Sequence, residues 1–147
     1  MKQLNNLLRL SGVERRVLLY ACLLLNGIRL ALWLLPFNMV RQRISRLASV
    51  WVCHNLTSPV SVGKIVWSVD IASRYTPGGV MCLVRALTTQ LLLTRYGYKH
   101  QLHIGVAKSE NGNLTAHAWI EYNGRVIVGG LHNLSQFKPL SAVRAKL

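Results

Sequence analysis

Acidic residues are scarce in this sequence. Its 147 residues include only four, Glu14, Asp70, Glu110 and Glu121, against 18 lysines and arginines. No two of the four are close neighbours, which argues against paired-carboxylate chemistry of the glycosidase type and against a carboxylate-rich Mg²⁺ site. The net charge of +14 favours an anionic partner, but it does not choose among nucleic acid, anionic lipid and acidic peptide.

Cysteines are also few, and they lack the spacing of a metal site. The three are Cys22, Cys53 and Cys82, with no CxxC pair and no Cys/His spacing typical of zinc. The first residues do not form a secretory signal, because the apolar run begins late and no small-residue cleavage site follows it. We therefore expect a reduced, cytoplasmic protein without a metal or other cofactor.

No repeat or low-complexity linker divides the chain. We expect a helical region rich in leucine and arginine over 1–57 and a catalytic core over 58–147, together forming one compact unit. Ser11 and Glu14 match a capping box and Pro36 ends the helix that follows. The predicted helices run from Val13 to Leu35, Asn38 to Ala48, Val60 to Arg74 and Cys82 to Tyr96.

The segment Val17–Leu35 has nearly the length of a membrane span and is mostly leucine. Asn26, Gly27 and Arg29 interrupt its second half, and a central arginine costs roughly 2.5–3.5 kcal/mol on insertion scales. We expect this helix to be buried in the protein core or in a partner groove. Insertion into a membrane, or association with its surface, remains the alternative.

After Gly97 the hydrophobic period changes from 3.6 to 2. Leu102, Ile104 and Val106 alternate with smaller or polar residues, which predicts a strand. Further strands are predicted over 114–122 and 125–128, joined by Asn123-Gly124, a strong hairpin signal. Helices followed by an antiparallel meander indicate an α+β fold.

Cys82 and His117 are the candidate catalytic pair. Cys82 begins a helix after a Pro-Gly-Gly turn, where the helix dipole and the unpaired backbone N–H groups favour the thiolate and can stabilise an oxyanion. His117 lies on the second predicted strand, and this topology can bring its imidazole to the thiol. Trp119, on the same strand face, is a candidate for lining the cleft, and Arg85, one turn after Cys82, for lowering the thiol pKa.

The runs PGGVMCLVRALTTQLLLTRYGY, HIGVAK and AHAWIEYNGRVIVGG closely resemble the leader-peptidase (B2) proteins of lasso-peptide biosynthesis, which are transglutaminase-like, papain-like cysteine proteases. ERRVLLYACLLLNGIRLALWLLPF is similar to the leading helices of that family. The resemblance implies removal of the leader from a ribosomally made precursor peptide during antibiotic biosynthesis. It also implies two partners on separate chains: a winged-helix protein that recognises the leader, and a lasso cyclase that closes the macrolactam ring.

The family's triad is usually Cys-His-Asp, with the Asp on the strand after the His. If Asn123-Gly124 forms a two-residue turn, His117 pairs with Gly130, and the acid position falls on Gly129 or Gly130, which carry no side chain. We rank Asn133 first as the group that orients the imidazole. Asp70, Glu121, a backbone carbonyl or a simple dyad are the alternatives.

Three other functions fit part of the sequence. A membrane-associated, non-catalytic binding protein would use the leucine-rich helix and the positive charge, and it would tolerate loss of Cys82. A nucleic-acid binder fits the charge alone, since no helix-turn-helix, zinc finger or basic-aromatic motif is present, and we expect no nucleic acid partner. A transamidase would use the same thiol chemistry with an amine in place of water.

Overall fold

The computed structural model describes residues 8–51, 60–78 and 82–139. Its elements are α2 (Gly12–Leu34), α3 (Phe37–Val50), α4 (Val62–Arg74), α5 (Cys82–Arg95), β1 (Gln101–Lys108), β2 (Leu114–Tyr122), β3 (Arg125–Val128), the 3₁₀ turn η1 (Leu134–Gln136) and β4 (Lys138–Pro139). Helices come first and an antiparallel sheet follows, so the predicted α+β class is confirmed.

Local chemistry places the ends of α2 and α4. The Ser11 hydroxyl accepts from the Glu14 N–H at 3.3 Å, and the Glu14 carboxylate accepts from the Ser11 N–H at 3.0 Å, which completes the predicted capping box. Pro36 separates α2 from α3. The predicted start of α4 at Val60 is two residues early, because Ser61 has an extended backbone and caps the helix by accepting from the Lys64 N–H.

The sheet has the order β3-β2-β1-β4. Asn123 and Gly124 both have positive φ, as the tight hairpin between β2 and β3 requires. Beyond the turn, a bulge between Ile120 and Glu121 shifts the register, and β3 ends opposite Ile120. The expected pairing of His117 with Gly130 is therefore wrong.

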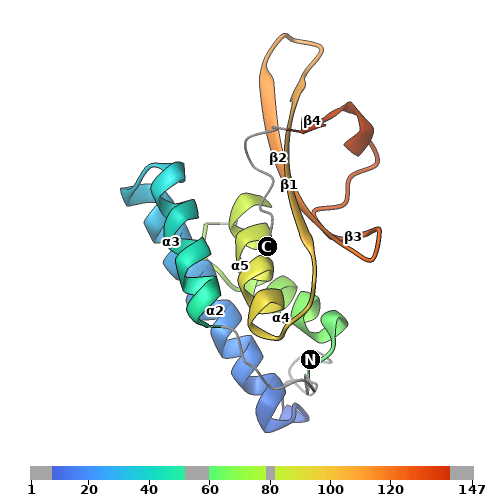
Figure 1. Cartoon of the computed structure of the whole chain (residues 1–147). Coiled ribbons are helices and arrows are strands. Elements are labelled where there is room, and N and C mark those ends of the chain that lie inside the picture. The colour runs from blue at the N-terminus through green and yellow to red at the C-terminus, as the bar shows by residue number, and fades with distance from the viewer. Residues whose placement is uncertain (1–7, 52–59, 79–81, 140–147) are drawn as a thin grey trace.

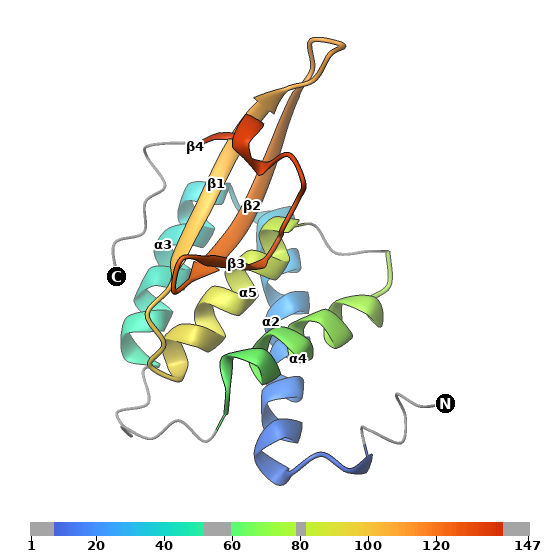
Figure 2. The same ribbon diagram turned by 90° about the vertical axis from the view of Figure 1, so that its right-hand side faces the viewer.

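Helix α5 is the centre of the core. It contacts α2, α3 and α4 as well as β1, β2 and β3, and its residues Val84–Leu93 are almost all buried. Figures 1 and 2 show the sheet on one side of α5, with α2 and α3 on the side away from the sheet. The leucine-rich α2 shares one hydrophobic core with α4, α5 and the sheet.

Alternation along β2 gives the sheet two different faces. Leu102, Ala118 and Ile120 join the helical core. His117 and Trp119 are at the intervening positions and lie on the opposite face, where Phe137 contacts the His117 ring. The sheet therefore carries its candidate catalytic histidine on the face that the segment after β3 covers.

Candidate active site

Cys82 is the first residue of α5, as predicted, and its thiol is partly exposed and not in a disulfide. Residues at the start of a helix have backbone N–H groups without intrahelical acceptors. Together with the helix dipole they favour negative charge, on a thiolate or on a substrate oxygen. Of the predicted Pro-Gly-Gly turn, Gly79 lies outside the described residues.

Arg29 of α2 contacts the turn that precedes Cys82. Its guanidinium donates a hydrogen bond to the Pro77 carbonyl. Gly78 has φ +79°, and a Cβ there would lie 2.8 Å from the Arg29 Nη2, so the guanidinium packs directly on this glycine. The arginine that seemed out of place in an apolar helix thus ties α2 to the approach to the candidate nucleophile.

His117 is half-buried on β2, and its Nε2 lies 2.7 Å from the Gly129 carbonyl oxygen. A carbonyl oxygen can only accept a hydrogen bond, so Nε2 must carry the proton. In the neutral ring Nδ1 is then the nitrogen with a free lone pair. The Gly129 carbonyl therefore fixes the tautomer in which Nδ1 is available as a base.

Gly129 can present this carbonyl because it has no side chain. Its φ is +77°, a left-handed conformation that costs other residues energy, and a Cβ would lie 2.5 Å from the Ala118 carbonyl oxygen. A backbone oxygen thus contacts the His117 ring, where the resemblance implied an acidic side chain. The backbone carbonyl was one of the open alternatives in the sequence, and the structure is what selects the Gly129 oxygen.

The side chains that were expected to orient the imidazole form their hydrogen bonds with other groups. Asn133, the first choice, precedes η1, and its amide donates to the Gln136 side chain at 3.4 Å. The structure therefore brings Gly129, not Asn133, to the His117 ring.

The two acidic alternatives are also engaged by other groups. Asp70 pairs with Arg74 at 2.9 Å and with Arg85 at 3.2 Å. Glu121 lies 3.3 Å from His103. Arg85, considered as a partner of the thiol, is thus committed to a carboxylate.

An aromatic row surrounds the imidazole. The Trp119 ring is nearly parallel to both His117 and His103, with centroids 6.2 and 5.4 Å away and interplanar angles of 17°. Gly105 stands opposite His117, and a Cβ on it would lie 2.9 Å from the Phe137 Cβ and 3.1 Å from the Trp119 ring. Trp119 is thus packed beside His117, while the parts played by His103, Gly105 and Phe137 had no signal in the sequence.

Cys82 and His117 belong to elements that pack together, since α5 lies against β2. The two side chains share no hydrogen bond in the described part of the chain. Because β3 pairs only with Ile120–Tyr122, β2 has no β3 partner at the level of His117. His117 and α5 lie on opposite faces of the sheet, so the structure does not bring this imidazole to the Cys82 thiol.

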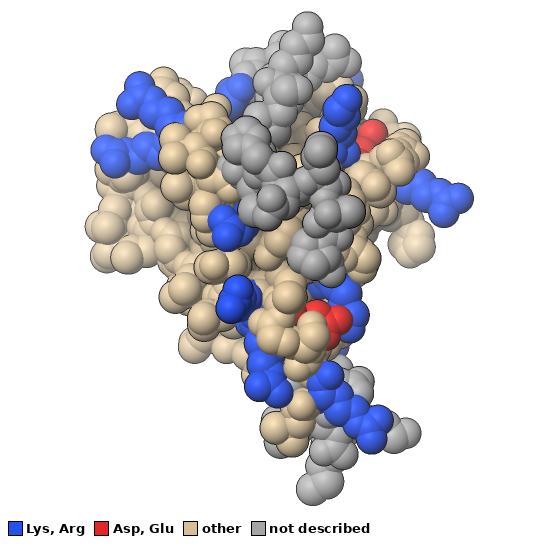
Figure 3. All heavy atoms as spheres, turned by 60° about the horizontal axis from the view of Figure 1, so that its bottom comes forward, with Lys and Arg blue, Asp and Glu red and all other residues tan. Residues whose placement is uncertain are grey.

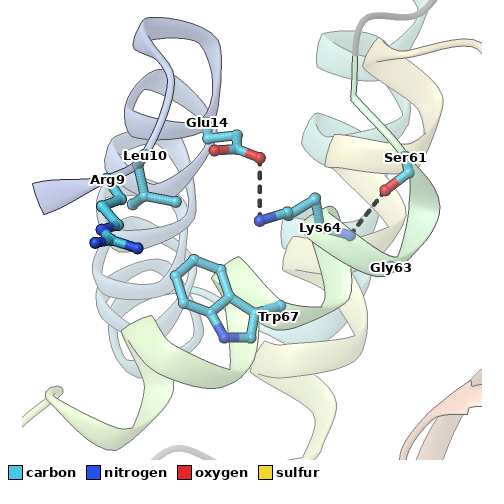
Figure 4. Close-up of a pocket in the computed structure, with 7 residues that line it drawn as sticks. All are labelled: Arg9, Leu10, Glu14, Ser61, Gly63, Lys64 and Trp67. Atoms are coloured by element: carbon cyan, nitrogen blue, oxygen red, sulfur yellow. Dashed lines mark hydrogen bonds and ion pairs between the residues drawn. The ribbon is translucent and has the colours of Figure 1, made fainter. Parts of the chain in front are cut away.

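A hollow of about 510 Å³ lies between the starts of α2 and α4 (Figure 4), lined by Arg9, Leu10, Glu14, Ser61, Gly63, Lys64 and Trp67. Lys64 bridges it, 3.0 Å from the Glu14 carboxylate and 5.5 Å from the Trp67 ring centroid. The hydrogen bond from the Ser11 backbone, and then Lys64, lower the pKa of Glu14. These contacts join α2 to α4.

This hollow lies away from Cys82. Tyr98, just beyond the end of α5, donates to the Val60 carbonyl just before α4 at 2.6 Å. The start of α4 is therefore near the end of α5, and Cys82 is at its other end, about 20 Å away along a helix of 14 residues. We do not assign the hollow to the candidate active site.

Two further observations bear on the chemistry. Burial raises the pKa of the Cys22 thiol, which makes it a poor nucleophile. Across the described residues, no three His, Cys, Asp or Glu side chains gather as ligands for a metal ion.

Comparison with known proteins supports the fold. Neither the curated proteins nor the solved structures contain a match to this chain. One family model matches residues 28–142, which include all of the helices and strands from α3 to β4 and both members of the candidate pair. On this match over most of its length, the chain belongs to the transglutaminase-like superfamily.

Proposed function

We propose that this chain is a cysteine peptidase in which Cys82 is the nucleophile and His117 the base. The observation that carries the proposal is the hydrogen bond from His117 Nε2 to the Gly129 carbonyl, which leaves Nδ1 as the acceptor nitrogen, in a superfamily member with a cysteine at the start of its central helix. The finer assignment, to removal of a leader peptide, draws on the sequence motifs around both residues.

The proposed reaction requires the His117 ring to move from the sheet face that it occupies here to the side of α5. Nδ1 then takes the proton of the Cys82 thiol as the sulfur attacks the scissile carbonyl carbon. Backbone N–H groups at the start of α5 receive the developing oxyanion. The imidazolium then gives its proton to the leaving amine and the C–N bond breaks, which leaves a thioester. Water, deprotonated by the same imidazole, releases the acid and restores the thiol.

We propose the leader segment of a lasso-peptide precursor as the substrate. In keeping with the resemblance, a separate winged-helix protein recognises the leader, and a lasso cyclase takes the shortened peptide. We place the reaction in the cytoplasm, where the thiol stays reduced. The described residues form one α+β unit whose helices and sheet are used in a shared core, so we assign leader recognition to the partner chain.

The test mixes the chain with precursor and recognition protein and follows cleavage by mass spectrometry. We expect Cys82→Ala and His117→Ala to abolish cleavage. Cys22→Ala, which removes a thiol on another helix, should leave cleavage intact. A Cys82→Ala variant that cuts as fast as wild type would end the proposal. Added amine distinguishes the transamidase: an amide product in place of the free acid would assign the chain to that activity.

A second measurement needs no substrate. Iodoacetamide alkylates thiolates, and peptide mapping reports each cysteine separately. We expect Cys82 to react at mildly acidic pH faster than Cys22, and His117→Ala to reduce that difference. Equal rates in wild type and His117→Ala would show that the imidazole does not activate the thiol.

A further inference from the structure

Helix α2 is apolar on its outer face as well as on its buried one. Val17, Ala21, Leu25 and Ile28 are buried against the rest of the fold. The outer stripe is made of side chains that are each more than half exposed: Leu19, Leu23, Leu30, Trp33 and Leu34. Trp33 alone is 81% exposed, which is unusual for a residue of its size.

The outer stripe follows one side of the helix. At 100° per residue its five members fall within about 100° of one another around the axis, with Asn26 and Gly27 between them. Arg15 and Arg16 stand at its amino-terminal end and are exposed. An apolar stripe of this length on a monomer marks an interaction surface.

Helix α3, which packs beside α2 (Figure 1), adds a basic and apolar groove. This arginine groove, of about 670 Å³, is lined by Met39, Gln42, Arg43, Arg46, Leu47 and Val50. Both of its arginines are exposed, and Val50 is 85% exposed. Apolar side chains here stand directly beside cations.

The positive charge of the protein indicates which partner suits this surface. Lysines and arginines outnumber acids by 18 to 4, and in Figure 3 basic side chains spread over the face shown while carboxylates occupy two small areas. Leucine and tryptophan next to arginine suit the boundary between headgroups and acyl chains of an anionic bilayer. Trp33 near the end of the stripe matches the preference of tryptophan for that boundary.

The contacts of α2 favour lying on a membrane over crossing it. By length and composition α2 is the one helix among the described residues that can span a bilayer, and 22% of its apolar window is buried in the fold. Its other face packs on α4 and α5, and Arg29 holds the Pro77 carbonyl. Crossing a bilayer would strip these contacts away, whereas lying in the interface keeps them.

We propose that the outer stripe of α2 and the arginine groove of α3 form a docking surface for an anionic membrane. The sheet and the His117 site lie on the far side of α5 from this surface, so the bound protein presents the site to the cytoplasm (Figure 2). This inference stands without the peptidase proposal, since it uses no catalytic residue.

The test is co-sedimentation of the full chain with vesicles of phosphatidylcholine alone and of phosphatidylcholine mixed with phosphatidylglycerol. We expect binding to the mixed vesicles to be at least about tenfold tighter and to weaken with salt. Leu23→Ser with Leu30→Ser, and separately Arg43→Glu with Arg46→Glu, should each weaken it about tenfold or more.

Matched controls lie on the sheet hairpins. Leu114→Ser with Val126→Ser removes two other exposed apolar residues, and Lys108→Glu with Arg125→Glu reverses two other exposed charges. We expect both control pairs to bind nearly as wild type does. Brominated lipids should quench tryptophan emission in wild type, and much less in Trp33→Phe.

Three results would overturn the proposal. One is equal binding to both kinds of vesicle. Another is a stripe variant that binds as its hairpin control does. The third is a stripe variant that converts a lipid-free dimer to a monomer, which would assign the surface to a second copy of the chain.

Discussion

Replacing Gly129 by alanine perturbs both the conformation of the turn after β3 and the hydrogen bond to His117. The residue has φ +77°, and a Cβ would lie 2.5 Å from the Ala118 carbonyl oxygen and 3.1 Å from the Trp119 Cα. Both neighbours belong to β2, whose backbone the core holds in place. The turn must therefore move, and the Gly129 carbonyl moves with it, away from the imidazole.

The expected loss of stability has two parts. A left-handed conformation costs an L-residue about 1–2 kcal/mol, and relieving the steric overlap brings the total to about 2–4 kcal/mol. At about 2–4 °C per kcal/mol for a domain near this size, the melting temperature should fall by roughly 4–16 °C. Gly130→Ala is the matched control, because its Cβ would meet only the Val126 Cγ1 at 3.8 Å and it has no positive φ.

The expected loss of reactivity follows from the bond to the imidazole. A net hydrogen bond of about 1 kcal/mol corresponds to roughly a fivefold change, and general-base catalysis as a whole is worth about 10²–10⁴-fold. Alkylation of Cys82 at mildly acidic pH should therefore slow by about fivefold to a hundredfold in Gly129→Ala and stay unchanged in Gly130→Ala. The measurement is made well below the melting temperature of the variant.

Two outcomes would contradict this reasoning at different steps. An unchanged melting temperature would mean that Gly129 is not held in the left-handed conformation. A destabilised variant whose Cys82 reacts at the wild-type rate would mean that the bond to Gly129 does not support the thiol chemistry.

Three further substitutions test the packing around the site. Burial lowers the pKa of His100 below its ordinary 6.5, so the folded protein binds this proton less readily than the unfolded chain. The contribution of neutral His100 to stability is fully present above about pH 6.5 and is lost as the pH falls below that value. His100→Gln should therefore flatten the decline of the urea midpoint between about pH 8 and pH 5. Arg29→Met removes the bond to the Pro77 carbonyl and should slow Cys82 alkylation about fivefold, whereas Arg16→Met, also on α2, should not. Gly105→Ala places a Cβ 2.9 Å from the Phe137 Cβ and should lower the free energy of unfolding, measured by chemical denaturation, by about 1–3 kcal/mol. Gly27 lies on a helix, and a Cβ there would meet nothing within 4 Å, so Gly27→Ala should raise the free energy of unfolding by about 0.5–1 kcal/mol. The opposite sign at either glycine would refute the packing described here.

Much of the fold follows from signals that act over a few residues. The capping box at Ser11, the break at Pro36 and the Asn123-Gly124 hairpin each depend on groups within three or four positions, and each is found where the sequence predicts it. The predicted start of α4, at Val60, is two residues early because the cap is Ser61. Strand β4, of two residues, is too short to show any period.

The site depends on contacts that no local pattern encodes. The bond from Arg29 to Pro77 joins residues 48 positions apart, and the bulge between Ile120 and Glu121 shifts the register of β3 on β2. A prediction that counts residue pairs outward from the hairpin fails at the first bulge. The pair Cys82 and His117 could be proposed from motif and spacing. The hydrogen-bond acceptor for the imidazole could be identified only from the structure.

The scarcity of acids explains why that acceptor is a backbone oxygen. Of the four carboxylates, Glu14 pairs with Lys64, Asp70 with Arg74 and Arg85, Glu121 lies beside His103, and Glu110 is exposed in the turn between β1 and β2.

A carbonyl differs from an aspartate in two ways that reach the chemistry. It carries no charge, so it stabilises an imidazolium less than a carboxylate would. It also takes up no proton in the working range, so the orienting bond survives at an acidity that would neutralise an aspartate. The acid limb of Cys82 reactivity should then report the thiol–imidazole pair alone, as one proton in the pH profile of alkylation. A second proton on that limb would show that a carboxylate takes part after all.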